Sequence, residues 1–276
     1  MNPFRLSRMM ILTLVLTALP IYAFAQSQPT PSPVPAPMKD PQAVAFATSA
    51  LVALTKGTQI GDITLTGTAT RAAGPDLQSG TVTLQALGTT DSRLDLNLDS
   101  GLLTEIRNSD IGSSQGVWID PEGIVHPFAP HNCLTDAVWF FPALSLLSQV
   151  SNANVVATYI GQETKNGSSV QHLQFSTQFP SLDSSTIGFV LPLTSEDIYL
   201  DSVSMLPVAI TFNTHPDNNV AVNIPVEIDF SNYQSVNGVQ VPYTIQELLN
   251  GGVFLSVKVQ STTLNSGLSG SIFSTN

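Results

Sequence analysis

Cysteine is nearly absent from the sequence, with a single residue, Cys133, among 276. One cysteine cannot form an intrachain disulfide, so packing alone must stabilise the fold even in an oxidising compartment. Basic residues are also few: 9 Lys and Arg stand against 20 Asp and Glu, and the formal net charge is −11. Because such a surface repels polyanions, the composition argues against nucleic acid as a partner.

Long apolar runs are confined to the N-terminus. Arg5 and Arg8 precede the apolar run "MMILTLVLTALPIYAF", and Ala23 and Ala25 fit a small-residue cleavage site. We therefore expect residues 1–25 to be a signal peptide cleaved near Ala25, which predicts a periplasmic or secreted protein. A retained membrane anchor is the alternative, since the run is not far short of a spanning length. No later run is long enough to span a bilayer, so we expect no transmembrane segment in the mature chain.

Residues 26–40, "QSQPTPSPVPAPMKD", are rich in proline and carry almost no charge. This composition predicts an extended tether without a core of its own, or a disordered N-terminus of the mature chain. The remaining length would suit one large β domain or two small ones. Since no second linker interrupts it, we expect residues 41–276 to form a single domain.

Two helices are expected. Asp40 suits an N-cap, Pro41 the first helical position and Gly57 the residue past the C-cap, so the first helix should cover residues 41–56. It is apolar nearly all round and must be buried on most sides. A second helix is expected to run from about residue 135 to 149, with a break or kink near Pro142. The segment 179–192 is expected to be an irregular loop.

Alternating apolar and polar residues predict about ten or eleven strands. Asn-Gly pairs at 166–167, 237–238 and 250–251 indicate tight hairpins, because a type I′ turn needs two residues with positive φ. No helices alternate with the strands, so the sheet should be antiparallel. The expected strands are 62–70, 81–87, 92–99, 116–120, 154–165, 167–177, 197–201, 205–212, 225–230, 239–246 and 253–260.

A comparison of areas predicts the fold. About ten strands of ~20 Å length at ~4.8 Å spacing present an apolar face on the order of 1,000 Å². Two helices, about 24 Å long and ~10 Å wide, cover only roughly 500 Å². Because soluble proteins rarely expose such a patch, the sheet should curl around its helices. The prediction is a mainly β (α+β) fold: a strongly curved antiparallel sheet forming an incomplete barrel, with two helices on its concave face. A plain β-sandwich is the structural alternative.

The closing segments resemble those of a known family. "VEIDFSNYQSVNGVQVPYTIQ", "LSVKVQSTTLN" and "IFS", within residues 226–273, are similar to the last strands of the lipoprotein-localisation carriers (LolA/LolB-like proteins). The early helix followed by "GDITLTGT", and "DIYLDSVSMLPVAI", agree with the family's opening and middle. The resemblance implies helices that cover an apolar cavity, and a role in carrying the acyl chains of lipoproteins across the periplasm. Other members bind partner proteins. The chain departs from the carriers in its length, its acidity and its Pro-rich leader.

Side chains at the inner face are the candidate ligand site. Any groove between helices and sheet would be lined by leucine and aromatic residues, which suits acyl chains or other apolar ligands. We therefore expect a non-enzymatic binder or carrier of apolar ligands. The alternative is an envelope interaction module with a filled core that docks a protein partner. The candidate lining residues, each of which could instead be plain core, are Leu65, Leu84, Leu94, Leu96, Trp118, Trp139, Phe140, Phe141, Leu144 and Leu147.

Catalytic and metal sites are weakly indicated. "GSSQG" matches the nucleophile-elbow pattern around Ser114, but a strand and not a helix is expected after it. His126, His131 and Cys133 lie close in sequence, yet their spacing fits no common zinc site. Asp197 is expected on the wet face of its strand, where a carboxyl keeps an ordinary pKa. The sequence thus predicts no enzyme, no cofactor and no metal.

Overall fold

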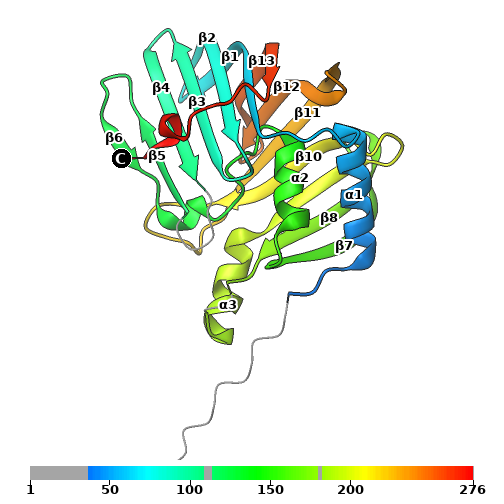
Figure 1. Ribbon diagram of the computed structural model, residues 1–276. Helices are drawn as coiled ribbons and strands as arrows, with labels where there is room; N and C mark the ends of the chain where they lie inside the picture. The colour runs from blue at the N-terminus through cyan, green and yellow to red at the C-terminus, as the bar shows by residue number, and fades with distance from the viewer. Residues whose placement is uncertain (1–36, 109–113, 180–181, 276) are drawn as a thin grey trace, which may run out of the picture. The chain divides into compact units, whose positions relative to one another are not determined.

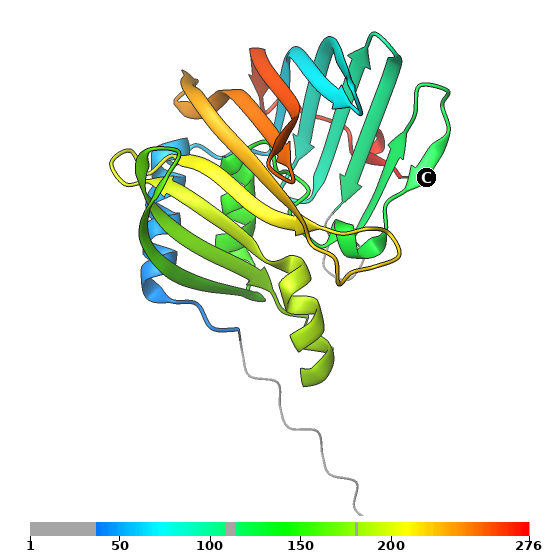
Figure 2. The same cartoon turned by 180° about the vertical axis from the view of Figure 1, so that it is seen from behind.

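The computed structural model describes residues 37–108, 114–179 and 182–275. The expected signal peptide, residues 1–25, and most of the tether lie outside these ranges. Within them, the chain forms one antiparallel sheet with its two longest helices on one side (Figures 1 and 2). None of the helices in these ranges combines the length and the apolar character needed to cross a bilayer.

The described residues contain thirteen strands, three α-helices and three short 3₁₀ helices. The helices are α1 (Pro41–Thr55), α2 (Pro142–Ser151), α3 (Ser184–Val190), η1 (Pro130–Cys133), η2 (Leu191–Thr194) and η3 (Gly270–Phe273). The strands are β1 (Asp62–Ala73), β2 (Asp76–Leu87), β3 (Asp91–Leu98), β4 (Gly101–Asn108), β5 (Gln115–Ile119), β6 (Val125–Pro127), β7 (Val155–Lys165), β8 (Ser168–Thr177), β9 (Glu196–Asp201), β10 (Pro207–Thr214), β11 (Ile224–Val236), β12 (Val239–Leu249) and β13 (Gly252–Leu264).

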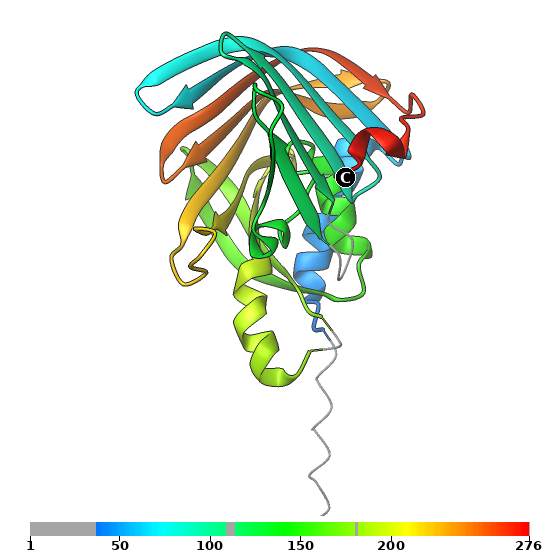
Figure 3. The same cartoon turned by 90° about the vertical axis from the view of Figure 1, so that its left-hand side faces the viewer.

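The strand order is β6-β5-β4-β3-β2-β1-β13-β12-β11-β10-β9-β8-β7. The first strand pairs with the last, so β1 and β13 join two meanders in the middle of the sheet. Strands β6 and β7 are its two edges, which leaves the barrel open. Figure 3 shows the sheet arching over the helices. The predicted class, a mainly β fold with a curved open antiparallel sheet, is confirmed.

Helix α1 matches its sequence signals. The Asp40 side chain accepts a hydrogen bond from Gln42 N at 2.8 Å, Pro41 opens the helix, and Lys56 adopts the left-handed conformation that ends it. Its buried side chains are mostly small: Ala43, Ala47, Ala50 and Leu54. Small side chains allow close approach, and α1 packs directly on α2, β7, β8 and β12.

The end of the expected tether is fixed to this part of the fold. Lys39 Nζ donates to the carbonyl oxygens of Val150 and Asn152, at 3.0 and 2.7 Å, and so satisfies the last turn of α2. Lys39 also forms a parallel bridge with Ala157 of β7. Residues 38–40 therefore pack with the domain.

Two helix predictions are wrong in detail. The second helix begins at Pro142 and not near residue 135, because proline lacks the N–H that a helix interior requires and is favoured at its first position. The segment 179–192, expected as a loop, contains α3. Asp183 starts that helix by accepting hydrogen bonds from Ser185 N and Thr186 N, both at 3.0 Å.

The count of ten or eleven strands is too low because β4 and β6 were missed. Strand β6 is only three residues long. Strand β4, "GLLTEIRN", places Glu105 and Arg107 on the concave face and buries Ile106 on the convex face, under Phe273 of η3. In β4, charged side chains point inward and an apolar side chain is buried on the outer face, which is the reverse of a strand with an apolar core face and a polar solvent face. The alternation in the sequence therefore did not identify this strand.

The hairpin predictions are confirmed. All three Asn-Gly pairs lie in turns with positive φ at both residues, for example 51° at Asn237 and 89° at Gly238. These turns fix the register of β7 with β8 and of β11 to β13. Leucine, valine and isoleucine side chains of the concave face then align across strands, as Leu65, Leu84 and Leu94 do on β1, β2 and β3.

Candidate functional site

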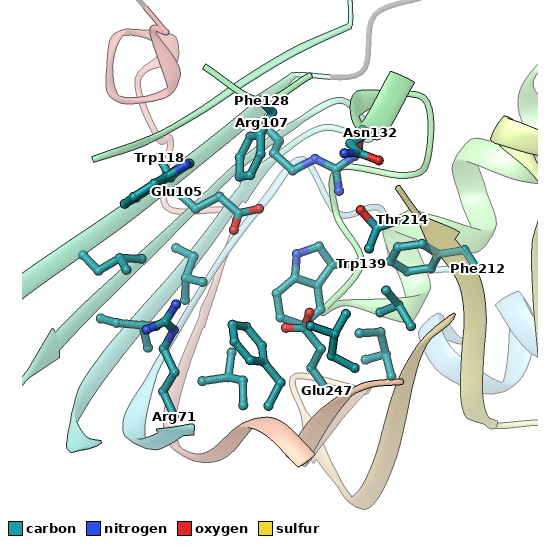
Figure 4. A pocket seen from close by; sticks show the side chains of 18 of the residues that line it. Arg71, Glu105, Arg107, Trp118, Phe128, Asn132, Trp139, Phe212, Thr214 and Glu247 are labelled. Atoms are coloured by element: carbon teal, nitrogen blue, oxygen red, sulfur yellow. The ribbon is translucent and has the colours of Figure 1, made fainter. Parts of the chain in front are cut away.

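The inner side of the sheet carries a cavity of about 430 Å³. Strands β1, β3, β4 and β5 form one wall and strands β10 to β13 the other, so the two meanders face each other across it. The segment after β6 contributes Phe128 and Asn132, and the segment before α2 contributes Trp139 (Figure 4). The volume lies in the range of pockets that bind small molecules.

Four of the candidate ligand residues line this cavity: Leu94, Leu96, Trp118 and Trp139. Leu94 pairs with Glu105 of β4, and Glu105 pairs with Trp118 of β5, so these side chains follow one another across the wall. The two tryptophans are the only ones in the chain. Phe128, Phe212 and Phe254 add further rings, which makes the lining rich in aromatic surface.

The other six candidates lie outside the lining. Leu65, Leu84, Phe140, Phe141 and Leu144 are fully buried in the core, and Leu147 is 40% exposed on α2. This cavity therefore does not lie at the expected position between the helices and the sheet. No residue of α1 or α2 lines it. Helix α1, whose buried side chains are mostly alanine, instead packs closely on α2 and on strands β7, β8 and β12.

Charged side chains also line the cavity: Asp217, which is exposed, and Arg71, Glu105, Arg107 and Glu247, which Figure 4 labels. Arg107 is buried and holds the segment after η1. Its Nη2 donates to the carbonyl oxygens of Asn132 and Thr135 at 3.2 and 3.0 Å, and its Nη1 donates to that of Asp136 at 3.3 Å. This guanidinium group thus binds the chain itself and has little capacity left for a ligand.

Glu105 and Glu247 differ from Arg107 because neither makes a hydrogen bond or an ion pair with any described residue. Burial, and then the nearby carboxyl of Glu105, raise the pKa of Glu247 to about 8 against the opposing charges of Arg107 and Arg71. Burial also raises the pKa of Glu105. Arg71 lies over the ring of Phe254, 4.9 Å from its centroid.

Sequence reasoning did not assign these charged residues to a ligand site. Glu105 lies in β4, which was not predicted. Arg71 comes directly after the predicted strand 62–70, and Glu247 directly after the predicted strand 239–246. The sequence did carry a signal for Glu247. In "VQVPYTIQELL", the two-residue alternation puts Glu247 on the same face as Val241 and Ile245, which are buried. A charged residue at an inward position is the feature that points to a site.

A pair of hydrogen bonds holds one side of the cavity. Asn132 Nδ2 donates to the carbonyl oxygen of His215 at 2.8 Å, and His215 N donates to Asn132 Oδ1 at 2.9 Å. Both residues line the cavity. The bonds join η1, which follows the edge strand β6, to the loop after β10, and so connect the two walls.

Next to this contact lies a buried polar cluster. Glu196 accepts a hydrogen bond from Asp136 N and lies 3.4 Å from Gln149 Nε2 of α2. Burial, and then the carboxyl of Asp136, raise the pKa of Glu196 to about 8. Asp197, on the other face of β9, contacts His172 at 2.8 Å and is half-buried, so the expectation of a freely wet carboxyl there needs correction.

The weaker chemical candidates do not assemble into a site. Ser114 directly precedes strand β5, so a strand and not a helix follows it in the "GSSQG" motif. Residues 109–113, before Ser114, lie outside the described ranges. His126 contacts Asp120 at 2.9 Å, whereas Cys133 is buried and approaches Ala129 O. Among the described residues, no group of three His, Cys, Asp or Glu side chains is arranged to hold a metal ion.

The open antiparallel sheet that curves around helices is similar in fold to the lipoprotein-localisation carriers. Among solved structures, the chain is similar to a domain from Vibrio parahaemolyticus that is named for outer membrane lipoprotein sorting, with a TM-score of 0.56 and 14% identity over 84% of this chain and 96% of that one. It is also similar to a DUF1329 family protein from Desulfovibrio piger, with a TM-score of 0.54 and 10% identity over 84% and 96% of the two chains. No family model matches the sequence, and no curated protein matches it. The resemblance predicted from the closing strands is confirmed at the level of the fold.

Proposed function

We propose that the protein is an exported, non-enzymatic binder or carrier of apolar ligands, such as the acyl chains of lipids or lipoproteins. It acts in the periplasm or outside the cell after loss of the signal peptide near Ala25. The ligand occupies the cavity between the two meanders and contacts Leu94, Leu96, Trp118 and Trp139. The similarity in fold to a domain named for lipoprotein sorting supports this assignment.

One observation carries the proposal. The cavity is bounded by leucine side chains and by five aromatic rings on the inner face of a sheet whose remaining inner face is filled by α1 and α2. Apolar surface that stays uncovered in a folded protein costs free energy, roughly 25 cal/mol per Å². An apolar ligand that covers this lining would recover that free energy, which makes the cavity a binding site for such molecules.

The experiment is a test of lipid content and uptake. Protein purified from envelope extract without detergent would be extracted with organic solvent and analysed by mass spectrometry. Stripped protein would then be titrated with an uncharged fluorescent alkyl probe below its critical micelle concentration. We expect co-purifying lipid and saturable uptake at one site per chain. Clean protein that takes up no alkyl probe would contradict the proposal and would favour the alternative, an envelope interaction module that docks a protein partner.

A further inference from the structure

The cavity contains more polar chemistry than an acyl chain needs. Glu105 comes from β4 and Glu247 from β12, and both carboxyl groups point into the same space (Figure 4). Neither has a hydrogen-bond or ion-pair partner among the described residues. Both side chains are partly buried, and burial raises the pKa of each carboxyl, so a ligand that brings hydrogen-bond donors or a positive charge to them would be stabilised there.

The two arginines do not provide that partner. Arg107 uses both terminal nitrogens on the carbonyl oxygens of residues 132, 135 and 136. Arg71 lies over Phe254 and makes no ion pair within 4.0 Å with a described carboxylate. Both guanidinium groups lower the pKa of Glu247 through space, but neither neutralises it by contact.

The aromatic lining favours a cationic partner. Trp118, Phe128, Trp139, Phe212 and Phe254 line the cavity, and the negative face of an aromatic ring attracts a cation. The cavity already shows this interaction, because the guanidinium of Arg71 lies 4.9 Å from the centroid of Phe254. Carboxylates together with ring faces are the groups that bind alkylammonium ions.

We propose that the ligand is an amphiphile with an ammonium group, whose apolar part lies against the leucine and aromatic lining while its cationic end contacts Glu105 and Glu247. This inference rests on the proposed function, because it concerns the same cavity, and it adds the chemical class of the ligand's polar end. The ammonium group supplies the hydrogen-bond donors that both carboxylates lack, and its charge offsets theirs.

The test uses three probes with one eight-carbon chain, namely octylamine, octan-1-ol and octyl sulfate, all below their critical micelle concentrations. Binding to the stripped full-length protein is followed by tryptophan fluorescence, since Trp118 and Trp139 are the only tryptophans and both line the cavity, and by calorimetry. We expect octylamine to bind at least about tenfold more tightly than octan-1-ol, and octyl sulfate to bind most weakly.

Variants assign the preference to the two carboxyl groups. In the double variant Glu105→Gln with Glu247→Gln, we expect the difference between octylamine and octan-1-ol to disappear. The matched control Glu122→Gln, in the exposed turn after β5, should leave all three affinities unchanged. Circular dichroism and a urea titration confirm that each variant is folded.

Each outcome of the binding test supports or contradicts the inference. If octan-1-ol binds and octylamine binds no more tightly, or if the double variant keeps the preference, the inference is wrong and the proposed function stands. If octyl sulfate binds most tightly, Arg71 and not the carboxylates selects the ligand, and the inference is again wrong. If none of the three probes binds, both the inference and the proposed function fail.

Discussion

Asn132 and His215 exchange two hydrogen bonds across 83 residues of sequence, at 2.8 and 2.9 Å. The Asn132 amide acts as a peptide group would in a sheet, donating to one backbone group and accepting from the other. The two bonds connect the segment after β6 with the loop after β10, next to the cavity. An open sheet thereby gains a contact between strands that do not pair with each other.

Loss of this contact should destabilise the fold. Asn132→Ala leaves the buried N–H and C=O of His215 without their partner, which we expect to cost roughly 2 kcal/mol of the free energy of unfolding. Urea titration measures the cost, and hydrogen exchange at the His215 amide reports the local opening. The control is Asn219→Ala, since the Asn219 side chain accepts a hydrogen bond only from Ala221 N, in the exposed loop after β10. Equal stability of the two variants would show that the contact contributes nothing.

The buried Glu196 should make stability depend on pH. Its pKa of about 8 means that it is neutral in the folded protein at pH 6 to 7, whereas it is ionised in the unfolded chain above about 4.5. Unfolding therefore releases a proton, and the free energy of unfolding should fall as the pH rises from about 5 to 8, by up to about 1.4 kcal/mol per unit. The groups that face Glu196 are Asp136, Arg107 and Asp197.

Glu196→Gln should reduce this slope, because glutamine keeps the acceptor for Asp136 N but does not titrate. Urea titrations at pH 5, 6.5 and 8 on both proteins measure the difference. Glu122→Gln, on an exposed turn, should leave the slope as it is. A slope that is the same in Glu196→Gln as in the original protein would assign the pH dependence to another group, such as Glu247.

Filling the cavity should block ligand uptake. Leu103 lies beside Leu96 on the wall and is half-buried, so Leu103→Phe extends a ring into the open space. We expect the affinity for an uncharged fluorescent alkyl probe to fall about tenfold, which corresponds to about 1.4 kcal/mol. Leu147→Phe makes the same change on the exposed side of α2 and should leave uptake unaltered. Similar losses in both variants would place the ligand elsewhere.

The affinity for octylamine should rise with pH. The amine stays protonated up to about pH 10, whereas Glu247 loses its proton near pH 8 and must do so to pair with the ammonium group. Binding should therefore strengthen by up to about tenfold per pH unit between 6 and 8 and then level off. Glu105, Arg71 and Arg107 face Glu247 and modulate this range. Calorimetry at three pH values measures it.

Octan-1-ol carries no charge, so its affinity should stay constant over the same range. In Glu247→Gln the pH dependence for octylamine should be lost. An affinity for octylamine that is flat with pH in the original protein would mean that Glu247 does not take part in binding.

Local signals predicted the elements that depend on neighbours in sequence. Asp40 and Pro41 mark the start of α1, and the pair Asn237-Gly238 marks a hairpin, because capping and positive φ are properties of two or three adjacent residues. The inward leucines Leu94 and Leu96 followed from alternation within one strand. Strand β4 escaped because Glu105 and Arg107 occupy its inward positions, and alternation assumes that inward means apolar.

The sequence by itself determined the antiparallel β class, the turns and which residues of each strand share a face, since these depend on short-range sterics and on a two-residue period. Only the tertiary structure decided where space remains inside. Whether an inward side chain such as Leu65 becomes core or one such as Leu94 lines a cavity depends on what the helices cover. It also depends on the register that brings Glu105 and Glu247 to one cavity, and long-range pairing sets that register.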